Sequence, residues 1–293
     1  MIIIDPILYA NMTLVSSGAP YSDYSAWSSV TAYVVGNKVN YNGKDYECLV
    51  ANTNVIPSSD AVKWLSLGSV NRLKCFDQTV GTQTYATGDL IFRIKPNDHF
   101  NSVAFFNVEG ASIQVQVIDP IEGVVYDKTK SLVNNNEVVN WYEYFYSDIL
   151  MQGDITFLDL PAYSNADIRV IISSTSTAKL GEIVIGRKKT IGLTNFGTSV
   201  SIQDYSKKEV DQFGNYYIVQ RRFAKTADYD VTMNTGSVST IQNLLAKLRS
   251  KPVVYIGDES APETIVYGFY KGFNIVISGP SASDGTIQVE GLT

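Results

Sequence analysis

Short stretches in which apolar and polar residues alternate recur along most of the chain, and this alternation constrains the fold more than any other feature. In Ser112–Ile118 (SIQVQVI), Ile113, Val115 and Val117 fall on one face and glutamines on the other, which is the period of a half-buried β-strand. The same signal predicts strands at Asp89–Ile94, Val124–Tyr126, Ile155–Leu160, Asp167–Ser173 and Gly181–Ile185. Short strands at even spacing predict an antiparallel β-sandwich of jelly-roll or galectin-like type.

The apolar positions of these strands define the core that we expect between the two sheets. They are Leu90, Phe92, Ile94, Val103, Phe105, Phe157, Leu158, Ile168, Val170 and Ile172.

The last third of the chain repeats the strand pattern around one helical segment. Ser239 with Gln242 forms a capping-box start, and Pro252 closes the segment, so a helix is predicted at about 239–250. Its apolar stripe has helical spacing: Ile241, Leu244, Leu245 and Leu248. Strands are predicted around it at Val200–Asp204, Asn215–Phe223, Asp228–Met233, Pro252–Ile256, Thr264–Tyr270, Phe273–Ile277 and Thr286–Glu290. This pattern predicts a second β-domain with one packed helix and no doubly wound nucleotide fold.

The charge balance limits the classes of partner. The formal net charge is −6, and basic residues cluster only in GRKK (Gly186–Lys189) and QRRFAK (Gln220–Lys225). Since polyanion binding needs clustered Lys and Arg, we expect no nucleic-acid partner. No apolar run reaches the roughly 18 residues of a membrane helix, so no membrane insertion is expected. The first residues, MIIIDPILYANM, lack the basic start of a signal peptide. We expect a soluble protein, made in the cytoplasm, with Cys48 and Cys75 as free thiols.

Residues that could carry catalysis are few. The single histidine, His99, lies beside Asp98 in a loop segment, where a lone imidazole is seldom a catalytic base. It is far in sequence from both cysteines, so no metal site built on His and Cys is expected. The GxSxG, P-loop and GxGxxG motifs are absent. We therefore expect no cofactor, no metal and no enzymatic activity.

Carboxylates near aromatic residues leave one enzymatic alternative open. Glu143, Asp148, Asp154 and Asp159 lie in or near WYEYFY (Trp141–Tyr146), and paired carboxylates beside aromatics are typical of a glycosidase cleft. With 29 acidic residues in the chain, such proximity is also expected by chance. The aromatic run could equally form a sugar-stacking or subunit-contact patch. A glycan-degrading enzyme therefore stays the minority hypothesis.

The stretch between Trp27 and Trp64 differs from the rest of the chain. Asn42-Gly43 lies between short strand patterns and is the strongest short signal for a type I′ hairpin. About 45 residues around one hairpin bury little apolar area, so large aromatics could be needed for a small core. The same aromatics could instead be a platform for sugar rings.

The spacing in this stretch resembles the small chitin-binding-type carbohydrate-binding modules of families 5 and 12. The matching positions are Trp27, Tyr33, Gly36, Val39, Tyr41, Gly43, Tyr46, Pro57 and Trp64. The resemblance implies a sugar-module fold, with Trp27, Tyr33, Tyr41, Tyr46 and Trp64 as candidate carbohydrate-binding residues. Two positions depart from the family: Asn37 replaces the usual Asp, and Leu49-Val50-Ala51 replaces adjacent exposed aromatics. Aliphatic side chains offer no flat ring for stacking.

A wider resemblance, over nearly the whole chain, is to a group of tail proteins from tailed bacteriophages and prophages. The segments that carry it are IIIDP (Ile2–Pro6), NRLKCFDQTVGTQT (Asn71–Thr84), GEIVIGRKKTIGLTNFG (Gly181–Gly197), DYSKKEVDQFGN (Asp204–Asn215), VYIGD (Val254–Asp258) and VEGL (Val289–Leu292). The resemblance implies a virion protein of the tail tip or baseplate that contacts other tail proteins and is synthesised in the host cytoplasm.

Together these patterns predict three parts. Residues 1–20 and 69–185 form a β-sandwich, 21–68 are an inserted module, and 186–293 form a β-domain that joins a homo-oligomeric ring. We expect the module to face the host surface and to bind its polysaccharide. The alternative is that it is only a spacer or a subunit contact.

Overall fold

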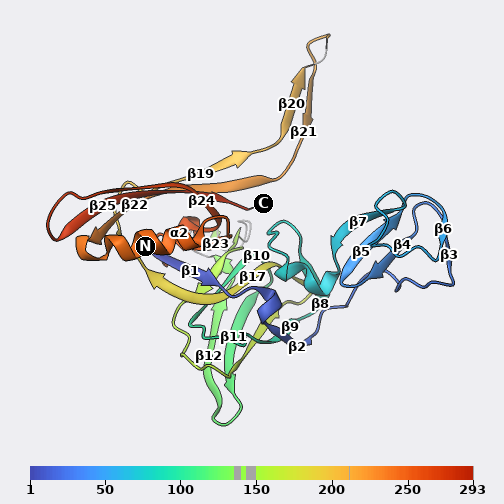
Figure 1. The fold of residues 1–293 in the computed structure, drawn as a ribbon, viewed down its shortest axis with the longest axis horizontal. Helices are drawn as coiled ribbons and strands as arrows, with labels where there is room; N and C mark the ends of the chain where they lie inside the picture. The colour runs from blue at the N-terminus through green and yellow to red at the C-terminus, as the bar shows by residue number, and fades with distance from the viewer. Residues whose placement is uncertain (135–139, 143–149, 211, 293) are drawn as a thin grey trace.

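Two large antiparallel sheets form the body of the protein (Figure 1). The computed structural model describes residues 1–134, 140–142, 150–210 and 212–292. The first sheet has eleven strands, in the order β15 (Ile155–Phe157), β10 (Ser102–Glu109), β17 (Thr177–Thr190), β1 (Ile2–Pro6), β23 (Val253–Ile256), β24 (Ile265–Val276), β25 (Ala282–Gly291), β22 (Phe223–Asn234) and β18 (Leu193–Thr194), with β8 (Thr84–Thr87) paired to β17 and β19 (Ser199–Asp204) paired to β22. The second has five, in the order β12 (Gly123–Ser131), β11 (Ser112–Asp119), β16 (Asp167–Ser173), β9 (Leu90–Lys95) and β2 (Thr13–Ser17).

Short elements connect these strands. They are the 3₁₀ turns η1 (Tyr9–Asn11), η2 (Asn71–Phe76), η3 (Thr235–Ser237) and η4 (Pro262–Thr264), and the paired strands β13 (Val133–Asn134) and β14 (Leu150–Met151).

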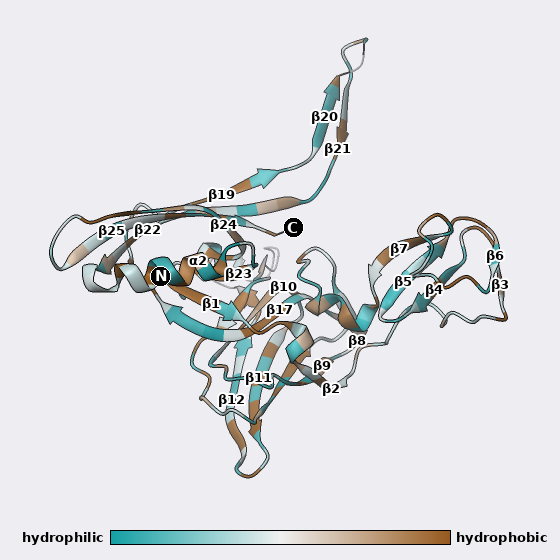
Figure 2. Cartoon of the chain, viewed as in Figure 1, coloured by the Kyte–Doolittle hydropathy of each residue, from teal (hydrophilic) through white to brown (hydrophobic). Residues whose placement is uncertain are grey.

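The five-stranded sheet packs against the β8–β10–β15–β17 part of the larger sheet. Buried residues alternate with partly exposed ones along β9, β11 and β16, as Figure 2 shows by hydropathy. The buried residues of both sheets form one core cluster, which contains every predicted core residue except Leu158. Leu158 is buried in a different cluster, with Phe106 and Tyr267. The predicted antiparallel, mainly β sandwich is confirmed.

The C-terminal part of the large sheet carries the helix α2 (Val238–Leu248). Ile241, Leu245 and Leu248 are buried in a second core with residues of β22, β23 and β25. The predicted helix and its packing on the sheet are confirmed, but the helix begins at Val238. Ser239 therefore lies inside the first turn. The preceding 3₁₀ turn is capped instead by Asn234, whose side chain accepts a hydrogen bond from the Gly236 N–H.

Strand β1 joins the two halves of the body. It pairs with β17 on one side and with β23 on the other. Ile3 is buried in the α2 core, and Ile4 is buried on the opposite face, since successive side chains of a strand point to opposite faces. The expected boundary at 185/186 falls inside β17, so the large sheet is continuous across it.

Residues 21–68 form a separate small unit at one end of the body (Figure 1). Its strands are β3 (Ala32–Tyr33), β4 (Lys38–Tyr41), β5 (Lys44–Cys48), β6 (Asn52–Thr53) and β7 (Trp64–Ser69). Strands β4, β5 and β7 make a three-stranded sheet, and β3 pairs with β6. Asn42 and Gly43 both have positive φ, 48° and 78°, as a type I′ turn requires.

A two-stranded ribbon, β20 (Lys207–Val210) and β21 (Tyr216–Val219), extends beyond β19 and β22 and points away from the body (Figure 1). Among the described residues, no helix is long and apolar enough to span a membrane.

Candidate binding module and cleft

Three of the five candidate carbohydrate-binding residues are buried in the core of the module. Tyr33 and Tyr46 are each 7% exposed and Trp64 is 2% exposed. The rings of Tyr33 and Trp64 meet edge to face, with centroids 5.2 Å apart. Trp64 Nε1 donates a hydrogen bond to the Val55 carbonyl at 3.1 Å. These three side chains belong to the core of the module and expose little of their surface.

Trp27 and Tyr41 lie at the edge of this small core. Both are half-buried, and their rings make an edge-to-face contact with centroids 5.5 Å apart. The backbone of Trp27 is held against β4, because the Trp27 backbone N–H donates to the Asn40 carbonyl and the Asn40 backbone N–H donates to the Ser25 carbonyl, both at 2.9 Å. Among the five candidate residues, Trp27 and Tyr41 are therefore the two that are only partly buried.

Exposed aliphatic side chains gather where two loops of the module meet. We define the aliphatic patch as Val34, Val35, Leu49 and Val50, which are 59%, 67%, 41% and 46% exposed. The loops are joined because the Gly36 N–H donates to the Cys48 carbonyl, and the Cys48 N–H donates to the Asn37 carbonyl, each at 2.8 Å. This patch includes two of the positions where the sequence departs from the chitin-binding pattern.

Asn37, the other departure, has a structural role that the sequence pattern did not reveal. Its side-chain oxygen accepts a hydrogen bond from the Val34 N–H at 2.9 Å. A carboxylate oxygen of Asp could accept the same bond, so the replacement leaves this turn intact.

Polar contacts fix the module to the sandwich. The Arg72 backbone N–H donates to the Tyr21 carbonyl at 3.2 Å, and the Val70 backbone N–H donates to the Gly43 carbonyl at 3.0 Å. Asn71 is fully buried; its side chain donates to the Tyr85 carbonyl at 3.0 Å and accepts from the Tyr85 N–H at 3.1 Å. The Tyr85 hydroxyl in turn donates to Asp23. These hydrogen bonds join Tyr21, Asp23 and Gly43 of the module to the body.

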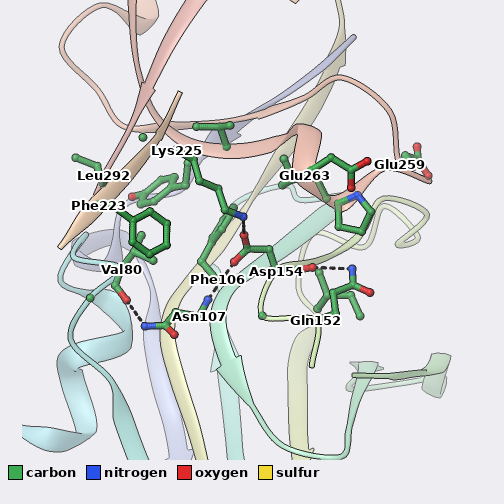
Figure 3. Close-up of a pocket in the computed structure, with 18 of the residues that line it drawn as sticks. Val80, Phe106, Asn107, Gln152, Asp154, Phe223, Lys225, Glu259, Glu263 and Leu292 are labelled. Carbon is green, nitrogen blue, oxygen red and sulfur yellow. Dashed lines mark hydrogen bonds and ion pairs between the residues drawn. The ribbon is translucent and has the colours of Figure 1, made fainter. Parts of the chain in front are cut away.

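A cleft of about 1050 Å³ lies between the sandwich and the C-terminal half of the large sheet (Figure 3). Its lining includes the aromatic residues Phe106, Phe223 and Tyr267. An ion pair between Lys225 and Asp154 crosses it. The Asp154 carboxylate also accepts from the Asn107 N–H at 3.2 Å. Sequence reasoning missed this cleft because its lining comes from segments far apart in the chain.

The carboxylates of the enzymatic alternative are paired with cations where the structure describes them. Asp154 pairs with Lys225, as above. Asp159 accepts from Lys128 Nζ at 2.9 Å and from the Tyr126 hydroxyl at 2.7 Å. Partial burial of Asp159 works against ionisation, but these hydrogen bonds lower its pKa below the ordinary value. Glu143 and Asp148 lie outside the described residues.

The remaining candidates for chemistry do not converge on one site. His99 is exposed, and the neighbouring Asp98 pairs with Arg187 at 2.7 Å. Cys48 and Cys75 are buried and free, and burial, more than any other cause, raises the pKa of the Cys75 thiol. No group of three or more His, Cys, Asp or Glu side chains suited to a metal ion occurs among the described residues.

The module matches a known family. Residues 26–61 match the family model of carbohydrate-binding module family 5/12, which confirms the resemblance stated for this stretch. No curated protein and no solved structure matches the chain. The likeness to bacteriophage tail proteins stays a prediction from sequence.

Proposed function

We propose that this chain is a non-enzymatic structural protein of a bacteriophage tail tip or baseplate, present in the virion as symmetric copies. In this role the C-terminal β-domain makes contacts between copies and to other tail proteins. The module of residues 21–68 presents its outer surface to polysaccharide of the host cell. The observation that supports sugar binding is the carbohydrate-binding family match, on a unit that stands at one end of the body; the tail role rests on the sequence resemblance described above.

The proposed sugar contact is the partly exposed edge formed by Trp27 and Tyr41. A small half-exposed surface gives weak binding by itself. Copies repeated around a ring convert later contacts into intramolecular ones, so overall avidity exceeds the affinity of one module. Host attachment by many weak modules is consistent with the small size of this surface.

The aliphatic patch supports a second candidate function. In that alternative the module is a spacer or a contact to a neighbouring tail protein, and the patch is buried in the assembled tail. Exposed apolar side chains that lie together are typical of protein interaction sites. The two candidate functions thus use different surfaces of the module: sugar binding uses the edge formed by Trp27 and Tyr41, and a contact to a neighbouring protein uses the aliphatic patch.

Binding by the full-length protein separates these two candidates. Immobilised protein is exposed to chitin, peptidoglycan and lipopolysaccharide-derived glycans. The amount of glycan that it retains is compared with the amounts retained by the Trp27→Ala and Tyr41→Ala variants. If the module binds host polysaccharide, the protein should retain glycan, both substitutions should reduce the amount retained, and Val50→Ser should leave it unchanged. If no glycan is retained, even by protein multimerised on beads, the sugar-binding function is eliminated and the architectural role remains.

The location in the virion has its own test. Antibody raised against residues 21–68 is used for immunogold labelling of particles from a lysate of the source. Gold at the tail end away from the capsid supports display at the tip. Gold that appears only after particle disruption supports burial of the module. Particles that carry no gold in either state would refute the tail assignment.

The enzymatic alternative makes a separate demand. Release of reducing ends from a surface polysaccharide would have to occur with the unsubstituted protein and disappear in Asp154→Asn or Asp159→Asn. Both carboxylates are held by lysines, so we expect no release from any of the three proteins. Release that depends on either carboxylate would overturn the non-enzymatic role.

A further inference from the structure

The ribbon formed by β20 and β21 is here called the arm; its second strand, β21, has the apolar sequence of a buried strand in an exposed position, while β20 is mainly charged. Tyr216, Tyr217, Ile218 and Val219 are 78%, 67%, 61% and 39% exposed. Since neighbours in a strand point to opposite faces, β21 places large apolar side chains on both faces of the arm. A continuous apolar run of this kind is typical of strands covered on both sides.

The arm cannot gain stability from its own two strands alone. Only four residue pairs join β20 to β21, from Lys207–Val219 to Val210–Tyr216. An isolated two-stranded ribbon is marginally stable in water and needs a third strand or a packed face. A flat surface would cover one face of the arm, whereas a cleft can cover both.

The cleft between the two halves of the body offers both aromatic and charged side chains to such an arm. Its aromatic wall includes Phe106 and Tyr267, which stack with centroids 5.4 Å apart. Glu259 and Glu263, also in its lining, are exposed and make no ion pair within the described part of the chain. On the arm, Lys208 is exposed and likewise makes no ion pair with described residues. Lys130 and Arg222 also line the cleft, so the complementary contact for Lys208 is local, with the exposed carboxylates of Glu259 and Glu263.

A chain cannot place its arm in its own cleft. Arg222 and Phe223, the residues that follow the arm, already line the cleft, and from there the arm runs outward and away from the body (Figure 1). The occupant that fits is therefore the arm of a second copy. Such a contact joins two different surfaces, so it repeats from copy to copy and generates a ring or an open filament.

We propose that the arm of each copy inserts into the cleft of the next copy, with Lys208 facing Glu259 and Glu263. This contact rests on the proposed role as an assembling structural protein, and it names the two surfaces through which copies join. Apolar burial of both arm faces supplies the stabilisation. The lysine–glutamate contact sets the direction and register in which the arm enters.

Disulfide trapping between differently labelled copies tests this contact directly. One full-length protein carries Lys208→Cys and the other carries Glu263→Cys; the native Cys48 and Cys75 are buried, so the added thiols are the accessible ones. After mixing and mild oxidation we expect a disulfide-linked dimer from the mixed pair. In the matched control, Val30→Cys replaces Lys208→Cys in the mixed pair; the Val30 side chain lies on the module and is 87% exposed. A control dimer as abundant as the mixed dimer, or linkage confined to arm–arm pairs, would overturn the proposal.

A charge exchange gives a second, independent test that does not depend on thiols. Lys208→Glu is expected to weaken self-association, measured by sedimentation velocity, by about tenfold or more. Glu259→Lys with Glu263→Lys should have the same effect. The protein that carries all three substitutions should associate again, because each arm then meets a cleft of opposite charge. Unfolding by substitution would not be rescued in this way, and association that none of the variants changes would contradict the contact.

Failure of this inference and failure of the proposed function give different results. Oligomers that form without arm–cleft linkage would remove the contact and leave symmetric assembly in place. A protein that stays monomeric at every concentration would remove both the contact and assembly by this chain alone. Arm–cleft linkage together with particles that carry no gold would keep the contact and remove the tail role.

Discussion

At the scale of single residues, Trp64 determines whether the module is folded. Its side chain is 2% exposed, contacts Tyr33 and donates a hydrogen bond from Nε1. We predict that Trp64→Ala destabilises the module by about 3–5 kcal/mol, while the body stays folded. Limited proteolysis within residues 21–68 measures the loss, and Val62→Ala, at a side chain that is 77% exposed, is the control. A module that resists proteolysis in Trp64→Ala would show that this ring is not part of the core.

Glu182 is a buried carboxyl group that makes stability depend on pH. Burial, and next the nearby carboxylate of Asp77, raise the pKa of Glu182 well above its ordinary value. The folded protein then holds a proton that the unfolded chain releases, so this contribution to stability is fully present below pH of about 4.5 and is lost as pH rises toward and through the raised pKa.

A neutral isostere tests this dependence. We predict that Glu182→Gln is more stable than the unsubstituted protein at pH 8 and equal to it near pH 4, since Gln can keep the bond from the Gln78 N–H. Urea unfolding at a series of pH values measures the difference. Equal stability at all values, or a difference that shrinks as pH rises, would contradict the assignment.

At the scale of elements, β1 holds the two halves of the large sheet together, and Gly186 permits its approach to β17. A Cβ atom at Gly186 would lie 2.2 Å from the Asp5 carbonyl oxygen. We predict that Gly186→Ala lowers the free energy of unfolding by about 1–3 kcal/mol, because the two backbones must separate. Urea denaturation checks this. Gly272→Ala is the control, since a Cβ there meets no atom within 4 Å; comparable losses in both variants would exclude the steric cause.

Local patterns in the sequence predicted the elements whose burial follows their own period. Strand β11 could be predicted from its own alternation of apolar and polar residues, and helix α2 from its own apolar stripe, without knowledge of residues far away in the sequence. The pairing of Ile2 with both Thr190 and Ile256 could not be predicted, because the sequence of a strand does not by itself specify which residues of a distant strand pair with it. The same holds for Trp64: its spacing in the sequence suited both a core and a platform, and only its packing against Tyr33 decides between them. The cleft and the free position of the arm are likewise products of tertiary contacts.

At the scale of the whole molecule, one continuous sheet joins the two halves of the body through β1. Ile3 and Ile4 of β1 enter two cores on opposite faces of the large sheet, and β17 passes from the sandwich core to the pairing with β1. Loss of either half therefore exposes apolar surface of the other. The module has its own core, and hydrogen bonds from the Arg72 backbone N–H to the Tyr21 carbonyl and from the Tyr85 hydroxyl to Asp23 join it to the body.

We therefore predict one unfolding transition for the body and a separable one for the module. Hydrogen exchange followed by mass spectrometry through a urea series gives a midpoint for each segment. Amides of β11 in the sandwich and of β24 in the C-terminal half should share a midpoint, whereas those of β5 in the module should have their own. In Trp64→Ala the β5 midpoint should fall alone. Distinct midpoints for β11 and β24 would mean that the two halves fold independently despite the strand they share.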